Sequence, residues 1–499
     1  MNLIPNATNE INQGVGRVET RPTVECTGTR TGADHRAECG GDSERMIGDG
    51  CKQTTLGSIS VFLNGGAWNQ TEYSEEGVPV VRVTDIKDET VDLTACKFLP
   101  KSSIGKYAKH LLRAGDLVIC TVGSHPTQPG SVVGRAAVMP YAAHGALLNQ
   151  NAVCIRSSSS DLDQHWLGYL GRSREFHDYI ISCARGSANQ VRMAIGLLKE
   201  MPVEIPPLSV QRRVAGILSA YDELIENNQR RICILEDMAR NLYREWFVHF
   251  RYPGHESVPL ADSPLGQIPQ GWEVKKLGDI AEDMRRNIPK GQLDEPQPYV
   301  GLEHIPRRSL ALDSWETASE LGSNKLAFRK GEVLFGKIRP YFHKVSIAPF
   351  AGLCSADTIV IRARLPENYA IVVCCVSSDE FVAHATATSN GSKMPRANWS
   401  VLEKFPVAIP VLAVARQFSA VVEPAIQQMQ ALIFQTANLR RTRDLLLPRL
   451  LSGQVTLATG TPPIYDEDEF KRMVEKGTQA WADMPDSAAW VETLRGGKE

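Results

Sequence analysis

Two stretches of the chain decide its fold: MPVEIPPLSVQRRVAGIL at residues 201–218 and FPVAIPVLAVARQFSAVV at residues 405–422. Each begins with an apolar residue and Pro-Val, passes through Ile-Pro, and continues into a long helical pattern. Proline removes a hydrogen bond from a helix and biases the preceding residue towards extended backbone. These prolines therefore predict extended chain that leads up to a helix, and one chain contains the same junction twice.

Similar segments precede the two junctions in the same order, which indicates that the whole module is duplicated. The ordered pairs are TTLGSISVF (54–62) with KKLGDIAED (275–283), VPVVRVTDI (78–86) with QPYVGLEHI (297–305), RAGDLVICTVG (113–123) with RKGEVLFGKIR (329–339), NAVCIR (151–156) with DTIVIR (357–362), and GSANQVRMAIGLLKEMPVEIP (186–206) with GSKMPRANWSVLEKFPVAIP (391–410). Each copy mixes short β-rich runs with helical stretches, which predicts a mixed α/β domain.

After each junction, seam positions recur in alternating steps of four and three, the pattern of a two-helix coiled coil. The predicted seam residues are Leu218, Ile225, Asn228, Ile232, Leu235 and Leu242 in the first helix, and Met429, Leu432, Leu439 and Leu446 in the second. Asn228, Thr436 and Arg443 interrupt the seam with polar side chains, which can fix the register of a helix pair. Pro424 predicts that the second helix starts late or kinks. The alternative is that each helix packs only on its own domain.

These patterns predict an α+β chain in which two mixed α/β domains alternate with two long helices that pair as an antiparallel coiled coil. The predicted segments are a mobile N-terminal extension (1–53), a first domain (54–208), a first helix (209–251), a second domain (252–410), a second helix (411–453) and an acidic tail (454–499).

Composition narrows the class of protein. The formal net charge of −2 argues against a uniformly basic nucleic-acid coat and leaves local basic surfaces open. The 11 cysteines form no C-x-x-C pair, so no metal site is expected. The chain has no secretory start and no apolar run long enough to span a membrane, so we expect a cytoplasmic protein.

The helical segments carry a family resemblance. PLSVQRRVAGILSAYDELIENNQRRICILEDMARNLYREWFVHF (207–250), LRRTRDLLLPRLLSGQV (439–455) and GEVLFGKIRPYFHK (331–344) resemble segments of type I restriction–modification specificity subunits. The resemblance covers about residues 54–455 and implies that 54–208 and 252–410 are target-recognition domains. Each would contact one half of a split double-stranded DNA site, and the helices would set the gap.

The resemblance also implies partners and a division of labour. Two methyltransferase subunits would dock along the helices and methylate adenine with S-adenosylmethionine, and restriction/translocase subunits would join for cleavage. This chain itself would bind no cofactor and catalyse no reaction. It contains no N-P-P-Y or D-P-P-Y motif and no G-x-x-x-x-G-K-[ST] phosphate loop, which argues against methyl transfer by the chain alone. Two alternatives stay open: a modification-only specificity subunit without a nuclease partner, and a coiled-coil protein scaffold that does not bind DNA.

Candidate DNA contacts lie in equivalent places in the two copies. FRKGEVLFGKIRPYFHK (328–344) is the strongest basic cluster, and its counterpart VICTVGSHPTQPGSVVGRAAV (118–138) is richer in small polar residues. Arginine and lysine neutralise phosphates, and arginine and amide side chains read base edges. The predicted DNA-binding residues are Arg135, Ser187, Asn189, Gln190 and Arg192 in the first copy and Lys337, Arg339, Tyr341, Lys344, Lys393 and Arg396 in the second.

Overall fold

The computed structural model describes residues 50–87, 89–124, 131–187, 190–391 and 393–455. All of these residues belong to one compact unit, Arg45–Glu499. The predicted N-terminal extension lies almost entirely outside the described residues, as does most of the acidic tail.

We call residues 52–205 head 1. Its strands are β1 (Lys52–Thr55), β2 (Ser60–Asn64), β3 (Val78–Val81), β4 (Glu89–Thr90), β5 (Lys97–Leu99), β6 (Leu117–Cys120), β7 (Val122–Gly123), β8 (Ala136–Val138), β9 (Leu147–Leu148), β10 (Ala152–Ser157), β11 (Ala184–Ser187), β12 (Gln190–Met193) and β13 (Pro202–Ile205). Its helices are α1 (Leu56–Ile59), α2 (Ile104–Tyr107), α3 (Gln164–Leu170), α4 (Arg174–Ser182) and α5 (Ile195–Lys199). The main sheet has the order β2-β10-β6-β8-β4, beside three-stranded sheets β5-β3-β9 and β11-β12-β7.

We call residues 260–409 head 2. Its strands are β14 (Leu260–Ser263), β15 (Gly266–Pro269), β16 (Glu273–Lys276), β17 (Ala281–Asp283), β18 (Arg286–Ile288), β19 (Gln297–Val300), β20 (Glu316–Ala318), β21 (Lys325–Phe328), β22 (Val333–Gly336), β23 (Val345–Ile347), β24 (Gly352–Ser355), β25 (Thr358–Ala363) and β26 (Pro406–Ile409). Its helices are α7 (Leu277–Ile280), α8 (Tyr369–Val376), α9 (Asp379–Ala387) and α10 (Trp399–Leu402). Its larger sheets have the orders β17-β25-β22-β23 and β18-β21-β24-β19-β20.

The two heads share the strand pairing of their main sheets and of their junction strands, as a duplicated module predicts. The Pro-Val-x-Ile segment of each junction is a strand that closes its head against the opening strand, with Thr54 opposite Val203 in head 1 and Lys275 opposite Val407 in head 2. In each main sheet the equivalent strand, β10 or β25, lies between the strand that opens the sheet and the strand that precedes the candidate DNA loop. The predicted mixed α/β class is confirmed.

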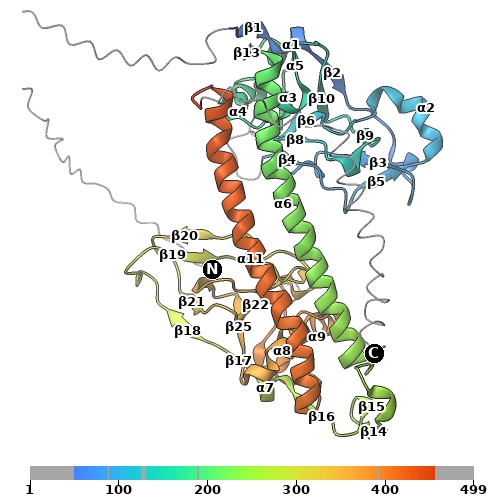
Figure 1. Cartoon of the computed structure of the whole chain (residues 1–499), viewed down its shortest axis with the longest axis vertical. Helices are drawn as coiled ribbons and strands as arrows, with labels where there is room; N and C mark the ends of the chain where they lie inside the picture. Colours follow the sequence, from blue (N-terminus) through green and yellow to red (C-terminus); the bar gives the residue numbers. More distant parts are fainter. Residues whose placement is uncertain (1–49, 88, 125–130, 188–189, 392, 456–499) are drawn as a thin grey trace, which may run out of the picture. The chain divides into compact units, whose positions relative to one another are not determined.

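The two long helices are α6 (Leu208–Tyr243), which continues into a π-helical turn (Arg244–Val248), and α11 (Leu412–Leu451). They pack side by side, as Figure 1 shows. The end of α6 meets the beginning of α11 where Phe247 contacts Phe418, and Asp222 near the beginning of α6 pairs with Arg443 near the end of α11. The helices are therefore antiparallel. Of the two outcomes expected at Pro424, the late start is wrong, because α11 begins at Leu412, within one residue of the predicted start at 411, and continues through Pro424.

Burial along the helices follows the predicted seam. Leu218, Ile225, Asn228, Ile232, Leu242, Met429 and Leu432 are buried, and Leu235, Leu439 and Leu446 are half-buried. The core of head 1 includes the first turns of α6 and Leu450 of α11, whereas the core of head 2 includes the last turns of α6 and the first turns of α11. Each head thus packs on a different end of the helix pair.

Among the described helices, none is by itself long and apolar enough to cross a membrane. One bent pair, Pro366–Val376 with Asp379–Ala387, meets the length and composition requirement only when its two members are taken together.

Candidate nucleic-acid interface

The strongest predicted cluster forms a strained turn between β22 and β23, which we call the basic turn (residues 337–344). Arg339 and His343 both have left-handed backbone, with φ of 50° and 52°, on either side of the short helix Pro340–Phe342. Such backbone is costly for residues other than glycine, so the surrounding contacts must hold it. Nε2 of His343 donates to the carbonyl oxygen of Ser377 at 2.9 Å, and burial lowers the pKa of His343. The turn is therefore fixed before any ligand binds.

Aromatic and cationic side chains meet on this turn. Tyr341 is 52% exposed and contacts Phe342 edge to face, with ring centroids 4.8 Å apart. The guanidinium of Arg307 lies 4.1 Å from the centroid of the Phe342 ring, and that of Arg339 lies 5.8 Å from it. Cation–π contact orients a guanidinium without neutralising its charge. Sequence reasoning missed Arg307, for which the only signal was an Arg-Arg pair in a loop distant from the cluster in sequence.

The two lysines of the turn are held differently. Nζ of Lys337 donates to the carbonyl oxygen of Ala356 at 2.8 Å, and Nζ of Lys344 donates to the carbonyl oxygen of Leu302. Burial lowers the pKa of both amines, and the charge of Arg307 adds to the effect at Lys344. These amines brace the turn in the free protein, and their contact with DNA stays a prediction.

The second predicted segment of head 2 lies against the basic turn. The backbone N–H of Arg339 donates to Pro395 at 2.8 Å, and that of Ala397 donates to Lys337 at 2.9 Å. Arg396 is exposed and lies 3.5 Å from a carboxylate oxygen of Asp357, and Lys393 is exposed. Segments more than 50 residues apart in sequence thus form one surface that presents several cations.

Head 1 brings the equivalent segments together. Strand β12 pairs with β7, with Val191 opposite Gly123 and Arg192 opposite Val122. Arg192 is exposed, whereas Arg135 is half-buried and donates to the carbonyl oxygen of Ile86 at 3.3 Å. Ser187 and Gln190 end the strands of the β11–β12 hairpin, and their side chains, together with Asn189, lie outside the described residues. The predicted surface of head 1 therefore has the same backbone position as that of head 2.

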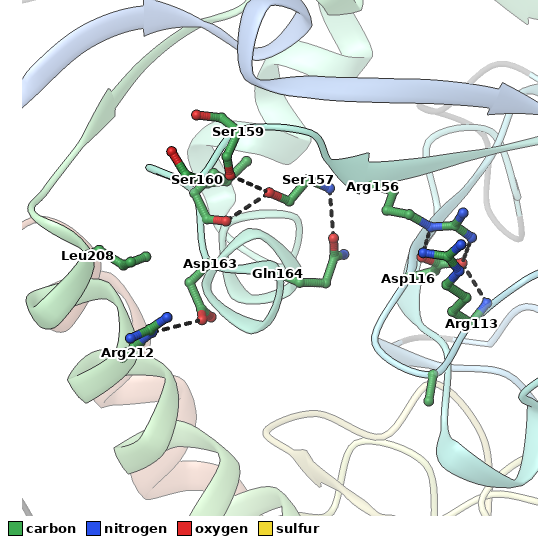
Figure 2. A pocket seen from close by; sticks show the side chains of 12 residues that line it. Arg113, Asp116, Arg156, Ser157, Ser159, Ser160, Asp163, Gln164, Leu208 and Arg212 are labelled. Atoms are coloured by element: carbon green, nitrogen blue, oxygen red, sulfur yellow. Dashed lines mark hydrogen bonds and ion pairs between the residues drawn. The ribbon is translucent and has the colours of Figure 1, made fainter. Parts of the chain in front are cut away.

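A separate pocket of about 350 Å³ opens where head 1 meets the beginning of α6 (Figure 2). Its charged groups largely satisfy one another: Arg156 pairs with Asp116 at 2.6 Å, and Arg212 faces Asp163 at 3.9 Å. Beside it the buried Gln211 donates to the carbonyl oxygens of Asp161 and Pro206, at 2.7 Å each. This arrangement joins head to helix, and we assign it no ligand.

Within the described residues, no group of three or more His, Cys, Asp or Glu side chains is placed to hold a metal ion.

Two equivalent heads on an antiparallel helix pair, each with a polar surface built from the same two loops, define a two-headed recognition protein. Residues 49–236 match the family model described as type I restriction modification DNA specificity domain. The type I restriction enzyme MjaIX specificity subunit of Methanocaldococcus jannaschii is 26% identical over 300 residues, covering 58% of this chain and 68% of that protein. The EcoDI specificity subunit of Escherichia coli is 27% identical over 310 residues, covering 56% and 69%.

A solved type I restriction–modification S subunit from M. genitalium is 15% identical and covers 80% of this chain and 96% of its own, with a TM-score of 0.49. Residues 49–236 thus match the DNA specificity domain of type I restriction–modification systems, and the chain is similar to the specificity subunits of such systems.

Proposed function

We propose that each head of this specificity subunit reads one half of a split DNA site. The observation that carries the proposal is the equivalent pairing of two candidate loops in each head, with different side chains on the same backbone. In head 2 the surface carries Arg307, Arg339 and Tyr341, whereas the head 1 stretch is rich in hydroxyl and amide groups. Each base pair presents its own pattern of hydrogen-bond donors and acceptors in the groove. Two surfaces that carry different side chains therefore suit different half-sites.

The helix pair, as an antiparallel coiled coil, would set the distance between the half-sites. Helices of 36 and 40 residues are about 54 and 60 Å long at 1.5 Å per residue. That length is roughly one and a half turns of B-DNA, whose turn is about 34–36 Å. A gap of fixed length between the half-sites follows from a spacer that is rigid on this scale.

The helix pair would also dock the methyltransferase subunits, which would bind S-adenosylmethionine and methylate adenine. Four large apolar side chains of the two helices are exposed: Leu224 on α6 (52%), and Leu412 (48%), Phe434 (38%) and Leu445 (55%) on α11. Exposed apolar side chains on the helices are candidates for contact with a protein partner. Restriction/translocase subunits would join the same complex in the cytoplasm, and this chain would contribute recognition and no catalysis.

Two measurements test the proposal. Mapping of methylated adenines in the host genome should give an asymmetric motif split by a gap of constant length. The assembled complex should then bind a duplex that carries this motif, with an affinity that falls steeply with salt.

The outcomes separate the alternatives. Co-purification of methyltransferase subunits without a nuclease identifies a modification-only complex. If the complex binds no duplex at any salt concentration, the chain is a protein scaffold and the proposal is overturned.

A further inference from the structure

Five side chains from three parts of the fold form one network, which we call the charged cluster: Glu89, Tyr169 and Arg172 of head 1, Asp222 of α6 and Arg443 of α11. Arg443 occupies a seam position and donates to Asp222 at 2.7 Å and to Glu89 at 2.7 Å. Arg172 bridges the same two carboxylates, at 2.7 Å each, and the hydroxyl of Tyr169 donates to Asp222 at 2.8 Å. Both helices and head 1 therefore meet at a single set of charges.

The charges of the cluster are shared between its members. The side chains of Arg172 and Arg443 are 8% and 7% exposed, and both guanidinium groups contact the carboxylates of Glu89 and Asp222, with Asp444 as a further partner of Arg443 at 2.8 Å. Burial raises the pKa of Asp222, but the bonds and charges of Arg172 and Arg443 outweigh it and leave the pKa below its ordinary value. A buried charge that loses its partner is strongly destabilising, so a shift of either helix or of head 1 is opposed by all the others.

The other end of the helix pair has the same backbone but no such charges. The junction strands differ by 204 residues (Val203 and Val407), which makes Asp222 equivalent to Ile426 and Ala239 equivalent to Arg443. The N-cap serines of α4 and α9, Ser173 and Ser378, make Tyr169 and Arg172 equivalent to Cys374 and Ser377.

Strand register relates Glu89 to Leu310. Strand β4 runs parallel to β8 in head 1, and the Ala311–Ile347 bridge is its counterpart in head 2. Four of the five equivalents, Ala239, Leu310, Cys374 and Ile426, belong to one apolar core. The contact between Cys374 and the carbonyl of Ala239 repeats the meeting of head and helix at this end.

We propose that the charged cluster fixes head 1 and both helices in a single register and so determines which gap between half-sites the protein accepts. At the opposite end the equivalent positions are joined by apolar packing, which is non-directional and follows buried area, and α6 contacts head 2 there through one buried carboxylate, that of Glu236, which accepts from Ser309 and Ala311. A network of paired charges that links head 1 to both helices is satisfied in one arrangement. The five residues are positioning residues, and none needs to touch DNA. The inference rests on the proposed function.

The test uses the full chain assembled with its methyltransferase subunits. Arg443→Met removes the guanidinium and keeps side-chain length. Affinity is measured for duplexes with the native gap and with gaps one base pair longer and shorter. We expect the preference for the native gap to fall about tenfold, a change of ~1.4 kcal/mol, with circular dichroism confirming that the helices stay folded.

A matched control separates register from general stability. Ile426→Ala weakens the apolar end at the position equivalent to Asp222, and at a comparable fall in melting temperature it should retain the gap preference. Glu89→Gln and Asp222→Asn are milder changes that should shift the preference in the same direction even where Arg443→Met does not fold. An unchanged preference in the folded cluster variants overturns the proposal, as does an equal loss in Ile426→Ala. Failure of the wild-type complex to bind any duplex overturns the proposed function instead.

Discussion

The exposed arginines of head 2, rather than the lysines of the basic turn, should carry the salt dependence of DNA binding. The perturbation is the pair Arg307→Gln and Arg396→Gln. Arg307 keeps its charge on the face of Phe342, and Arg396 makes a surface ion pair of a kind that contributes little and is readily exchanged for a phosphate. Each lost phosphate contact lowers the slope of log binding constant against log salt by about 0.9, so the pair should lower it by about 1.8.

The assay is duplex binding between about 50 and about 200 mM salt, over which a slope change of that size corresponds to about tenfold in relative affinity. The matched control is Lys337→Met with Lys344→Met, whose amines already donate to backbone carbonyls. The control should keep the slope and lose about 0.5–1.5 kcal/mol of stability for each hydrogen bond removed, since water can reach the exposed Ala356 carbonyl. A control that flattens the slope as much as the arginine pair would refute this assignment of the phosphate contacts.

Three further outcomes are expected. Phe418→Ala should cost about 3–5 kcal/mol in urea unfolding because it empties a fully buried site among aromatic rings, whereas Phe434→Ala on the same helix, 38% exposed, should cost clearly less. Gln211→Ala should lower the free energy of unfolding by about 1–3 kcal/mol, because it leaves backbone groups of head 1, the carbonyl of Asp161 and the N–H of Asp163, without their hydrogen-bond partner. A variant as stable as wild type would contradict this. Burial raises the pKa of Glu236 above 4.5, so this group's contribution to stability should fall as pH rises from about 4.5 through the raised pKa. Glu236→Gln should remove that part of the decline in pH-dependent unfolding, and an identical pH profile would refute it.

Much of the fold follows from local patterns. The duplicated junction predicts the two modules, and the spacing of apolar residues predicts two helices with a common seam, because both features repeat over short distances along the chain. Pro424 is expected to delay or kink the second helix, yet α11 begins at Leu412, as the predicted range 411–453 implies. A proline costs a helix one hydrogen bond, but the neighbouring buried residues Val422, Ala425 and Ile426 anchor α11 on both sides of it.

The sequence predicts which loops form the candidate site, but it does not predict the contacts that their side chains make. The two segments of head 2 were identified by their charge, yet the lysine amines turn to backbone carbonyls that no local pattern reveals. Arg307 reaches Phe342 across a turn of the fold, and Arg443 meets Glu89, which is 354 residues away. The sequence marks Arg443 as a polar residue in an apolar seam, and only the fold supplies its partners.

The charged cluster occurs at one end of the helix pair, so the two heads are not interchangeable. A head suited to the first position carries Glu89, Tyr169 and Arg172, and at the second position these groups would meet the apolar surroundings of Ile426 and Ala239. A second-position head moved to the front would leave Asp222 and Arg443 without head partners. We therefore expect an exchange of the two heads within this chain to be penalised by buried charge.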